Sequence, residues 1–408
     1  MGPSEANLPL SKKQLRRIRD YIAVRIPLVP EGYKIVVDKT AFDALLQEAL
    51  SANRSLKDRL RQKETSLPPK KLRQLKGALL NQFNSKAGHL PFHVSELENE
   101  AAETKRTLIM AGPIKLTQEG YTEEEKMQIF KEWFCIRHAL VKAGAHLEVL
   151  SASSEGGGFR EVYTRDRYVM IGDTAFLPDP QKLQHINDSK SFIERLPQHE
   201  VAGYQREIAQ IEKALKERGI RTVTVDGAWF EGGNVVRHYS SQTIFVGLGP
   251  DYVWNSEESA EKLVAAINRA QNNKWSLLSV PLTNEDMYHM DTGMSEELPH
   301  GEVLLSPLVT DKKTYEKICN IVGPQNVIKL SNTDAFNLAT NMIDVGNTLI
   351  MTGNCRKVRE QLVKKGYTVV MPEDYGQPDF EFGAGGVHCM TNDVRQIKPK
   401  KKTEPAPR

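Results

Sequence analysis

The feature that most constrains this fold is an alternation of strand and helix patterns that recurs five times between residues 101 and 396. Each segment contains short β-branched or apolar runs that predict strands, then an amphipathic stretch that predicts a helix, then another strand. The predicted helices span 124–142, 205–218, 257–271, 312–321 and 356–365. A pattern that recurs in phase is a stronger indication than any single element, so the chain is predicted to contain an α/β body with internal pseudo-symmetry.

Two of the repeats also resemble each other residue by residue. Phe-Glu-Gly-Gly-Asn-Val at 230–235, with Thr-Ile-Phe-Val-Gly at 243–247, compares with Phe-Asn-Leu-Ala-Thr-Asn at 336–341, with Thr-Leu-Ile-Met-Thr-Gly at 348–353. In both units the whole segment, 230–247 or 336–351, is predicted to form a pair of strands. A ring of such units would direct their inner loops toward one central pocket, so chemically active side chains are expected in those loops.

The first hundred residues have a different pattern. They predict helices after Ser11, at 42–50, 54–63 and 70–83, with one short strand within 32–37. They carry 18 Lys and Arg against 11 Asp and Glu, whereas the remaining 308 residues carry 37 against 41. We therefore interpret 1–100 as a basic, mainly helical accessory domain, 101–396 as the α/β body and 397–408 as a basic disordered tail. Two interpretations of the basic segment stay open: contact with nucleic acid or an acidic partner, and a solvated helix face.

Composition and cysteine usage indicate the compartment. Hydrophobic residues make up 39% of the chain without any run long enough to cross a bilayer, and the first ten residues lack the pattern of a signal peptide. The four cysteines show neither C-x-x-C nor metal-finger spacing. These features predict a protein with reduced thiols in the cytoplasm, without a membrane span.

One cysteine lies in a sequence that favours a role as a catalytic nucleophile. Cys389 follows Gly383, Gly385 and Gly386, whose missing side chains let other groups approach the backbone closely. A buried structural cysteine after a turn is the alternative. A thiol at its ordinary pKa needs a partner to become a nucleophile, and His289 together with a carboxylate such as Glu231 would provide one.

Four short motifs in this order resemble the pentein superfamily of guanidine-modifying enzymes. They are Tyr-Thr-Arg-Asp at 163–166, Phe-Glu-Gly-Gly-Asn at 230–234, His-Met-Asp-Thr at 289–292 and Gly-Gly-Val-His-Cys at 385–389. The first is similar to a segment of arginine deiminases, and the second to a segment of deiminases and dimethylargininases. The third is similar to a segment shared across the superfamily, and the fourth to segments of dimethylargininases and amidinotransferases. The resemblance covers about 101–396 and implies a five-fold pseudo-symmetric ββαβ propeller, without a metal or another cofactor.

The resemblance also implies roles for individual residues. Cys389 would attack the guanidinium carbon, His289 would transfer protons and Glu231 would orient His289. Asp166 and Asp291 would hold the planar cation by charge-assisted hydrogen bonds. The further residues expected at the substrate are Phe230, Arg165, Arg237, Asn337 and Gly386. Asn341 could line the pocket as well, and for both asparagines a role in a turn is an equal alternative. A zinc site formed by His289, Asp291 and Cys389 is disfavoured, because catalytic zinc sites need three good ligands and the resemblance implies no metal.

Departures from the family pattern leave the substrate and the reaction open. Deiminases and dimethylargininases carry an Arg for the substrate α-carboxylate after the Glu-Gly-Gly strand pair, whereas 247–252 here reads Gly-Leu-Gly-Pro-Asp-Tyr. Arg160, Arg165 or Arg237 would have to substitute, or the substrate is an agmatine-like amine or a peptidyl arginine. Hydrolysis to a ureido product is the first interpretation. Amidino transfer to an amine, favoured by Asn234, and a non-catalytic propeller that binds ribosomes or proteins are the alternatives.

Overall fold

The computed structural model describes most of the chain from residue 106 onward and shorter stretches before it. The described residues are 18, 28–31, 34–52, 69–85, 89–93, 96, 106–113, 122–150, 162–189, 196, 198–249, 255–272, 274–380 and 385–395. The chain divides into two compact units, Met1–Glu98 with Pro113–Cys135, and Asn99–Gly112 with Ile136–Arg408. The predicted helix at 54–63 and the tail 397–408 lie outside the described residues, as does Arg160.

The first unit combines a hairpin with helices. Strands β1 (Leu28–Glu31) and β2 (Lys34–Val37) pair antiparallel, and the helices are α2 (Lys39–Ala52) and α4 (Pro69–Ser85). Proline suits the first turn of α4 because the N–H group that it lacks has no partner there in any helix. The apolar faces meet in a cluster formed by Ile18, Val37, Phe42, Leu46, Ala49, Leu75, Leu79 and Phe83. The single strand predicted within 32–37 is thus the second arm of a hairpin.

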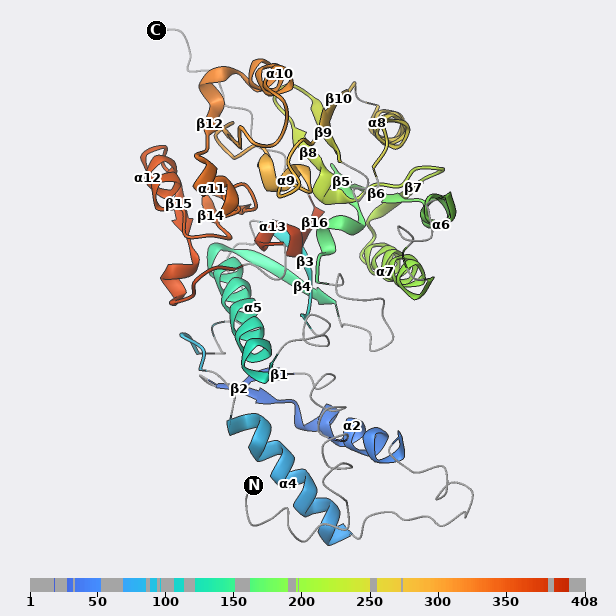
Figure 1. Ribbon diagram of the computed structural model, residues 1–408, viewed down its shortest axis with the longest axis vertical. Coiled ribbons are helices and arrows are strands. Elements are labelled where there is room, and N and C mark those ends of the chain that lie inside the picture. Colours follow the sequence, from blue (N-terminus) through green and yellow to red (C-terminus); the bar gives the residue numbers. More distant parts are fainter. Residues whose placement is uncertain are drawn as a thin grey trace. The chain divides into compact units, whose positions relative to one another are not determined.

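The second unit is mixed α/β, as predicted, and its described strands form five small sheets, none of which closes on itself (Figure 1). Along the chain the sheets contain β16 (Thr391–Arg395), β3 (Arg106–Ala111) and β4 (Ala145–Leu150); β5 (Val169–Ile171), β6 (Thr174–Pro178) and β7 (Arg221–Val225); β8 (Val235–His238), β9 (Thr243–Leu248) and β10 (Ser276–Pro281); β11 (Val303–Leu305) and β12 (Val327–Lys329); and β13 (Ile343–Val345), β14 (Thr348–Ile350) and β15 (Thr368–Val370). Each three-stranded sheet has one antiparallel and one parallel pair.

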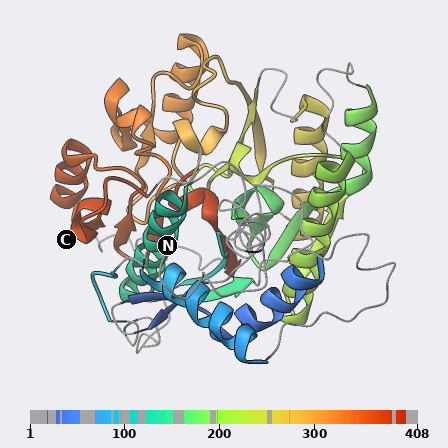
Figure 2. The ribbon, with the colours of Figure 1, turned by 60° about the horizontal axis from the view of Figure 1, so that its bottom comes forward.

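The parallel pairs require a crossover between their strands, and helices provide it. These helices are α5 (Glu123–Ala143), α7 (Gln198–Glu217), α8 (Glu257–Gln271), α10 (Lys312–Val322) and α12 (Arg356–Lys364), with α6 (Pro180–Ser189) preceding α7. Their starts are encoded locally: Ser256 caps α8 by accepting from the Ser259 N–H group, and Asp311 caps α10. Figure 2 shows α8, α10 and α12 at the periphery of the unit, with a short helix from the C-terminal part nearer its middle. None of the helices that the model describes is both long and apolar enough for a membrane span.

Hydrophobic clusters join each sheet to the next one in sequence. Val169 and Phe176 of the β5–β6–β7 sheet pack with Val235 and Ile244 of the following sheet. Phe245 and Leu278 pack likewise with Val303, and Leu304 with Leu349. Burial of these side chains is the main stabilising contribution, and it fixes consecutive sheets side by side.

Two details of the strand prediction were wrong. Residues 230–234 and 336–342 are not strand: the first contains the 3₁₀ turn η3 (Gly232–Asn234), and the second begins at the end of helix α11 (Asn332–Phe336), capped by Ser331. The hairpins therefore start later, at Val235 and Ile343. The sequence pattern also left the first repeat one strand short. Strand β16 supplies it, because Thr391 pairs with Met110 and Asn392 with Ile109.

Candidate active site

Five of the candidate residues, Asp166, Glu231, His289, Asp291 and Cys389, lie in or directly before four one-turn elements of the second unit. These are η2 (Thr164–Arg167), η3, α9 (Met290–Gly293) and α13 (Val387–Met390). Buried polar contacts tie these turns together: the Thr164 hydroxyl donates to the Met390 carbonyl at 3.0 Å, and the Gly233 N–H group donates to Asp166 Oδ1 at 3.1 Å. Residues more than 200 positions apart in the sequence thereby reach one place.

His289 is held between two carboxylates. Its Nε2 lies 2.9 Å from Glu231 Oε2, and its Nδ1 lies 3.7 Å from Asp166 Oδ1. Glu231 is fixed in turn, because its backbone N–H group donates to Asn255 Oδ1 at 3.2 Å. Burial alone would lower the pKa of His289, but the charges of Asp166 and Glu231 outweigh it and raise that pKa to about 9. The imidazole is therefore protonated at neutral pH.

Each of the two glycines in the Glu-Gly-Gly motif is required for a different steric reason. A Cβ atom on Gly232 would collide with the carbonyl oxygen of Arg165 in the adjacent turn. On Gly233 it would lie 2.6 Å from His289 Nδ1 and 2.8 Å from Asp166 Oδ1. Only a residue without a side chain lets these groups approach so closely, so this motif sets the spacing of the site.

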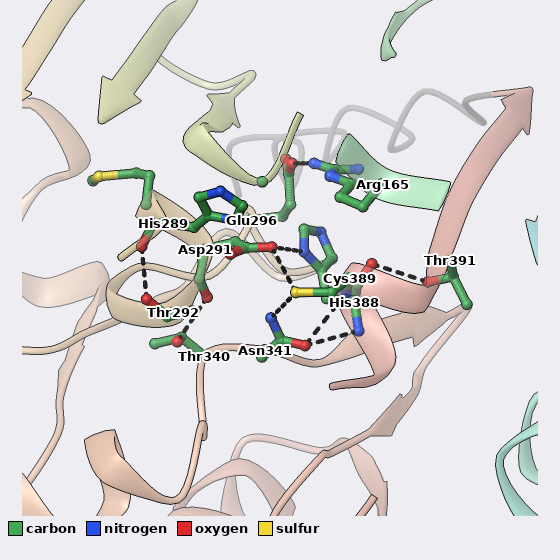
Figure 3. A network of polar contacts seen from close by, with 12 residues as sticks. Arg165, His289, Asp291, Thr292, Glu296, Thr340, Asn341, His388, Cys389 and Thr391 are labelled. Carbon is green, nitrogen blue, oxygen red and sulfur yellow. Dashed lines mark hydrogen bonds and ion pairs between the residues drawn. The ribbon is translucent and has the colours of Figure 1, made fainter. Parts of the chain in front are cut away.

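Cys389 lies in a second group of contacts (Figure 3). Its Sγ is 3.5 Å from Asp291 Oδ2 and 2.9 Å from Asn341 Nδ2. The neighbouring His388 places Nδ1 2.9 Å from the same Asp291 oxygen. The other oxygen, Asp291 Oδ1, is buried without a hydrogen-bond partner among the described residues, as is His289 Nδ1. Buried polar atoms of this kind are uncommon, and both of these have free hydrogen-bonding capacity within the site.

The thiol and the neighbouring imidazole are both held uncharged. Burial, followed by the charges of Asp291 and Asp166, raises the pKa of Cys389 well above its usual range. Burial and the Arg165 cation lower the pKa of His388, although Asp291 opposes this. At neutral pH the site therefore contains a thiol, a neutral His388 and a protonated His289.

The structure brings Cys389, His289, Glu231, Asp166 and Asp291 together, but the other candidates have different surroundings. Phe230 is buried in the apolar cluster between two sheets, and the side chain of Asn337 is exposed at the end of α11. Gly386 precedes α13, and a Cβ atom there would collide with Thr352. Asn341, rather than Asn337, reaches the thiol. The sequence indicated both asparagines as candidates for the lining of the pocket and did not distinguish between them.

Arg165 and Arg237 were expected to replace the missing carboxylate-binding Arg, but both are paired inside the protein. Each is nearly fully buried and forms an ion pair with Glu296. Arg237 also lies 3.4 Å from Asp393, which Arg106 contacts at 2.7 Å. Burial raises the pKa of Glu296, but Arg237 and Arg165 outweigh it and lower that pKa. Both guanidinium groups are accordingly already in ion pairs with carboxylates of the protein.

Replacing Glu296 with glutamine is expected to destabilise the protein by about 3 kcal/mol, because two buried guanidinium groups lose their counter-charge. Urea-induced unfolding measures the change. The adjacent Glu297→Gln is the matched control: its carboxylate binds Ser240 in a more exposed setting, so a change within about 0.5 kcal/mol is expected. Equal effects of the two substitutions would contradict the prediction.

The fold is similar to that of known amidine-modifying enzymes. The five small sheets of the second unit match solved structures of the pentein superfamily in fold. Among solved structures, the N-terminal domain of the cyanobacterial arginine dihydrolase ArgZ, bound to its substrate, covers 71% of this chain and 98% of its own length, at 18% identity and a TM-score of 0.55. A dimethylarginine dimethylaminohydrolase covers 71% and 99%, at 18% identity and a TM-score of 0.50. The resemblance predicted from the four motifs is thus confirmed.

Sequence comparison points to the same group of proteins. The bifunctional arginine dihydrolase/ornithine cyclodeaminases AgrE of Nostoc sp. and ArgZ of Synechocystis sp. are each 26% identical over 184 and 185 residues, or 41% of this chain. The chain matches only 24% of the length of these two relatives. No family model matches the sequence.

Proposed function

We propose that this protein hydrolyses a guanidino group to a ureido product through a covalent adduct of Cys389. The observation that supports this best is the convergence of one buried thiol, one protonated imidazole and three carboxylates from four separate turns. A guanidinium ion is planar and cationic, and it presents N–H donors in a fixed plane. Asp291 Oδ1 and Asp166 are carboxylate groups suited to accept them, and the five sheets would form a propeller around this pocket.

The first half of the reaction forms the adduct. When the guanidinium binds, its positive charge offsets the carboxylates, and the Cys389 thiol loses its proton to solvent. Sγ then bonds to the central carbon as the C=N electron pair moves onto nitrogen. His289 gives its proton to the departing nitrogen, the C–N bond breaks, and a cationic thiouronium remains on the sulfur.

The second half regenerates the enzyme. The now neutral His289 takes a proton from water as the water oxygen bonds to the same carbon. The C–S bond breaks with its electron pair on sulfur, and the protonated ureido product releases one proton, which replaces the proton that the thiol lost. Glu231 keeps the ring oriented throughout and stabilises its charge whenever His289 is protonated.

The test is an assay for products from several guanidino compounds. The full chain is incubated with arginine, agmatine, methylated arginine and an arginine peptide, and ureido and ammonia or amine products are measured. A ureido product from any of them supports hydrolysis and identifies the substrate class. Labelled amidine that appears on an added amine instead would establish amidino transfer, the alternative that Asn234 favours. No turnover of any kind would favour a binding protein on the same scaffold.

A guanidinium ligand is expected to lower the pKa of Cys389. In the empty site burial, Asp291 and Asp166 hold that pKa well above its usual range, so the thiolate fraction at pH 8 is small. Bound positive charge reverses the local effect and makes thiolate form at lower pH. The measurement is the ultraviolet absorbance of thiolate during a pH titration with and without a non-reactive guanidine, with Cys389→Ser subtracted. Identical titrations at saturating ligand would refute the proposed role of substrate charge.

A further inference from the structure

The surroundings of the Cys389 sulfur contain a group that the proposed reaction does not yet use. Cys389 is only 2% exposed, and its carboxylate neighbours oppose the formation of a thiolate. The Asn341 side chain is fully buried, and its Nδ2 lies 2.9 Å from Sγ. Among the described residues it is the one side chain that donates an N–H group to this sulfur. An amide N–H group is a donor, and a thiolate accepts a hydrogen bond more strongly than a thiol does.

The orientation of the Asn341 amide is determined by its other contacts. Its Oδ1 accepts from the backbone N–H groups of His388 at 3.0 Å and Cys389 at 3.4 Å. Turning the amide over would place its NH₂ group against these two donors, which cannot accept. The NH₂ group therefore faces the sulfur, as Figure 3 shows.

Asn341 is itself held in place. The Thr352 hydroxyl donates to the Asn341 carbonyl oxygen and accepts from the Val387 N–H group at 3.0 Å. The preceding residue, Thr340, donates from its hydroxyl to the carbonyl oxygen of Asp291 at 2.9 Å. This segment of the fifth repeat thus contacts both the turn that carries the thiol and the turn that carries Asp291.

We propose that Asn341 is a further catalytic residue, which directs the Cys389 sulfur and stabilises its thiolate by donating one hydrogen bond from Nδ2. This proposal rests on the proposed function of Cys389 as the nucleophile. The bond is strongest while the sulfur carries charge, before the S–C bond forms and again when the C–S bond breaks. Asn341 therefore favours the thiolate at both ends of the reaction without giving up a proton.

The third repeat offers a natural comparison. Asn234 Oδ1 accepts from the Met290 N–H group of helix α9 at 3.3 Å. Asn341 Oδ1 likewise accepts from N–H groups of helix α13, those of His388 and Cys389. Asn234 Nδ2, however, is buried without a hydrogen-bond partner among the described residues. The two asparagines thus share the contact to a one-turn helix and differ in the contact to sulfur.

The test compares Asn341→Asp with Asn234→Asp. Each substitution keeps an acceptor for the backbone N–H groups, but only Asn341→Asp replaces the donor that faces sulfur with an oxygen. The readout is the rate of iodoacetamide alkylation of the Cys389 peptide as a function of pH, followed by mass spectrometry so that the other cysteines do not interfere. At pH 8 we expect alkylation at least about tenfold slower in Asn341→Asp, the change that a shift of one pKa step produces, and the wild-type profile in Asn234→Asp.

A wild-type profile in folded Asn341→Asp would overturn the proposal. If Asn341→Asp does not fold, as judged by circular dichroism, Thr352→Val provides the same test with Thr352→Ser as its control: slower alkylation in the valine variant alone supports the proposal, and equal profiles overturn it. The measurement needs no substrate. A changed alkylation profile without any turnover by the wild type would therefore refute the proposed function and leave the N–H···S contact established.

Discussion

Replacing Cys389 with serine is expected to abolish turnover, with a loss of at least about 10⁴-fold in kcat, as is typical when the nucleophile of a covalent mechanism is removed. The oxygen of serine is a far weaker nucleophile, since its pKa lies well above that of a thiol. Asp166 and Asp291, the carboxylates proposed to bind the guanidinium, are retained, so substrate affinity should remain. Product formation and equilibrium binding of the substrate measure the two effects separately.

The matched control for this substitution is Cys319→Ser. Cys319 is half-buried in helix α10 and packs against the cluster between two sheets, away from the site. Its loss should leave kcat within about twofold. Acid quenching of the wild type during turnover, followed by mass spectrometry, should show the amidino adduct on the Cys389 peptide. A serine variant that retains turnover would remove Cys389 from the reaction.

The Gly233→Ala variant is expected to lower kcat by at least about 10²-fold while the protein remains folded. The added Cβ atom would lie 2.6 Å from His289 Nδ1 and 2.8 Å from Asp166 Oδ1, closer than nonbonded atoms can approach. The imidazole and the carboxylate must therefore move apart, and a displacement of about 1 Å in a reacting group can cost that factor. Steady-state kinetics with circular dichroism as a check on folding measure the effect.

Gly77→Ala provides the matched control. This glycine lies inside helix α4, and a Cβ atom there would have no neighbour within 4 Å. Alanine should leave kcat unchanged and stabilise the helix by about 0.5–1 kcal/mol. Equal kinetics of the two alanine variants would show that the close approach at Gly233 does not set the geometry of the site.

The sequence predicted the helices and strands of the second unit well because their signals are local. Helix α8 matches its predicted span 257–271, since Ser256 caps it and acidic residues occupy its first turn. The turns that carry the site were harder to predict. Phe230 and Phe336 look like strand residues, but Gly232-Gly233 and the cap at Ser331 interrupt the strand pattern.

The five polar residues brought together here were predicted from motifs, whereas most of their supporting groups were not. Thr352 and Glu296 form tertiary contacts that no local pattern contains, and Asn341 was one of two asparagines that the sequence did not distinguish. The pairing of Arg165 and Arg237 was not predicted for the same reason, because the Glu296 that pairs with them is distant from both in sequence. Single-sequence reasoning identifies which side chains are chemically suited to a site, but it cannot show which of them are already paired.

The pairing of β16 with β3 has a consequence for assembly of the site during synthesis of the chain. Cys389 lies two residues before β16, and that strand completes a sheet whose other members are residues 106–111 and 145–150. On the ribosome these earlier strands emerge well before β16, and their sheet lacks an edge until the last repeat has been synthesised. Cys389 is therefore synthesised after all of the other candidate residues, so a nascent chain cannot assemble the site before synthesis of this unit is nearly finished.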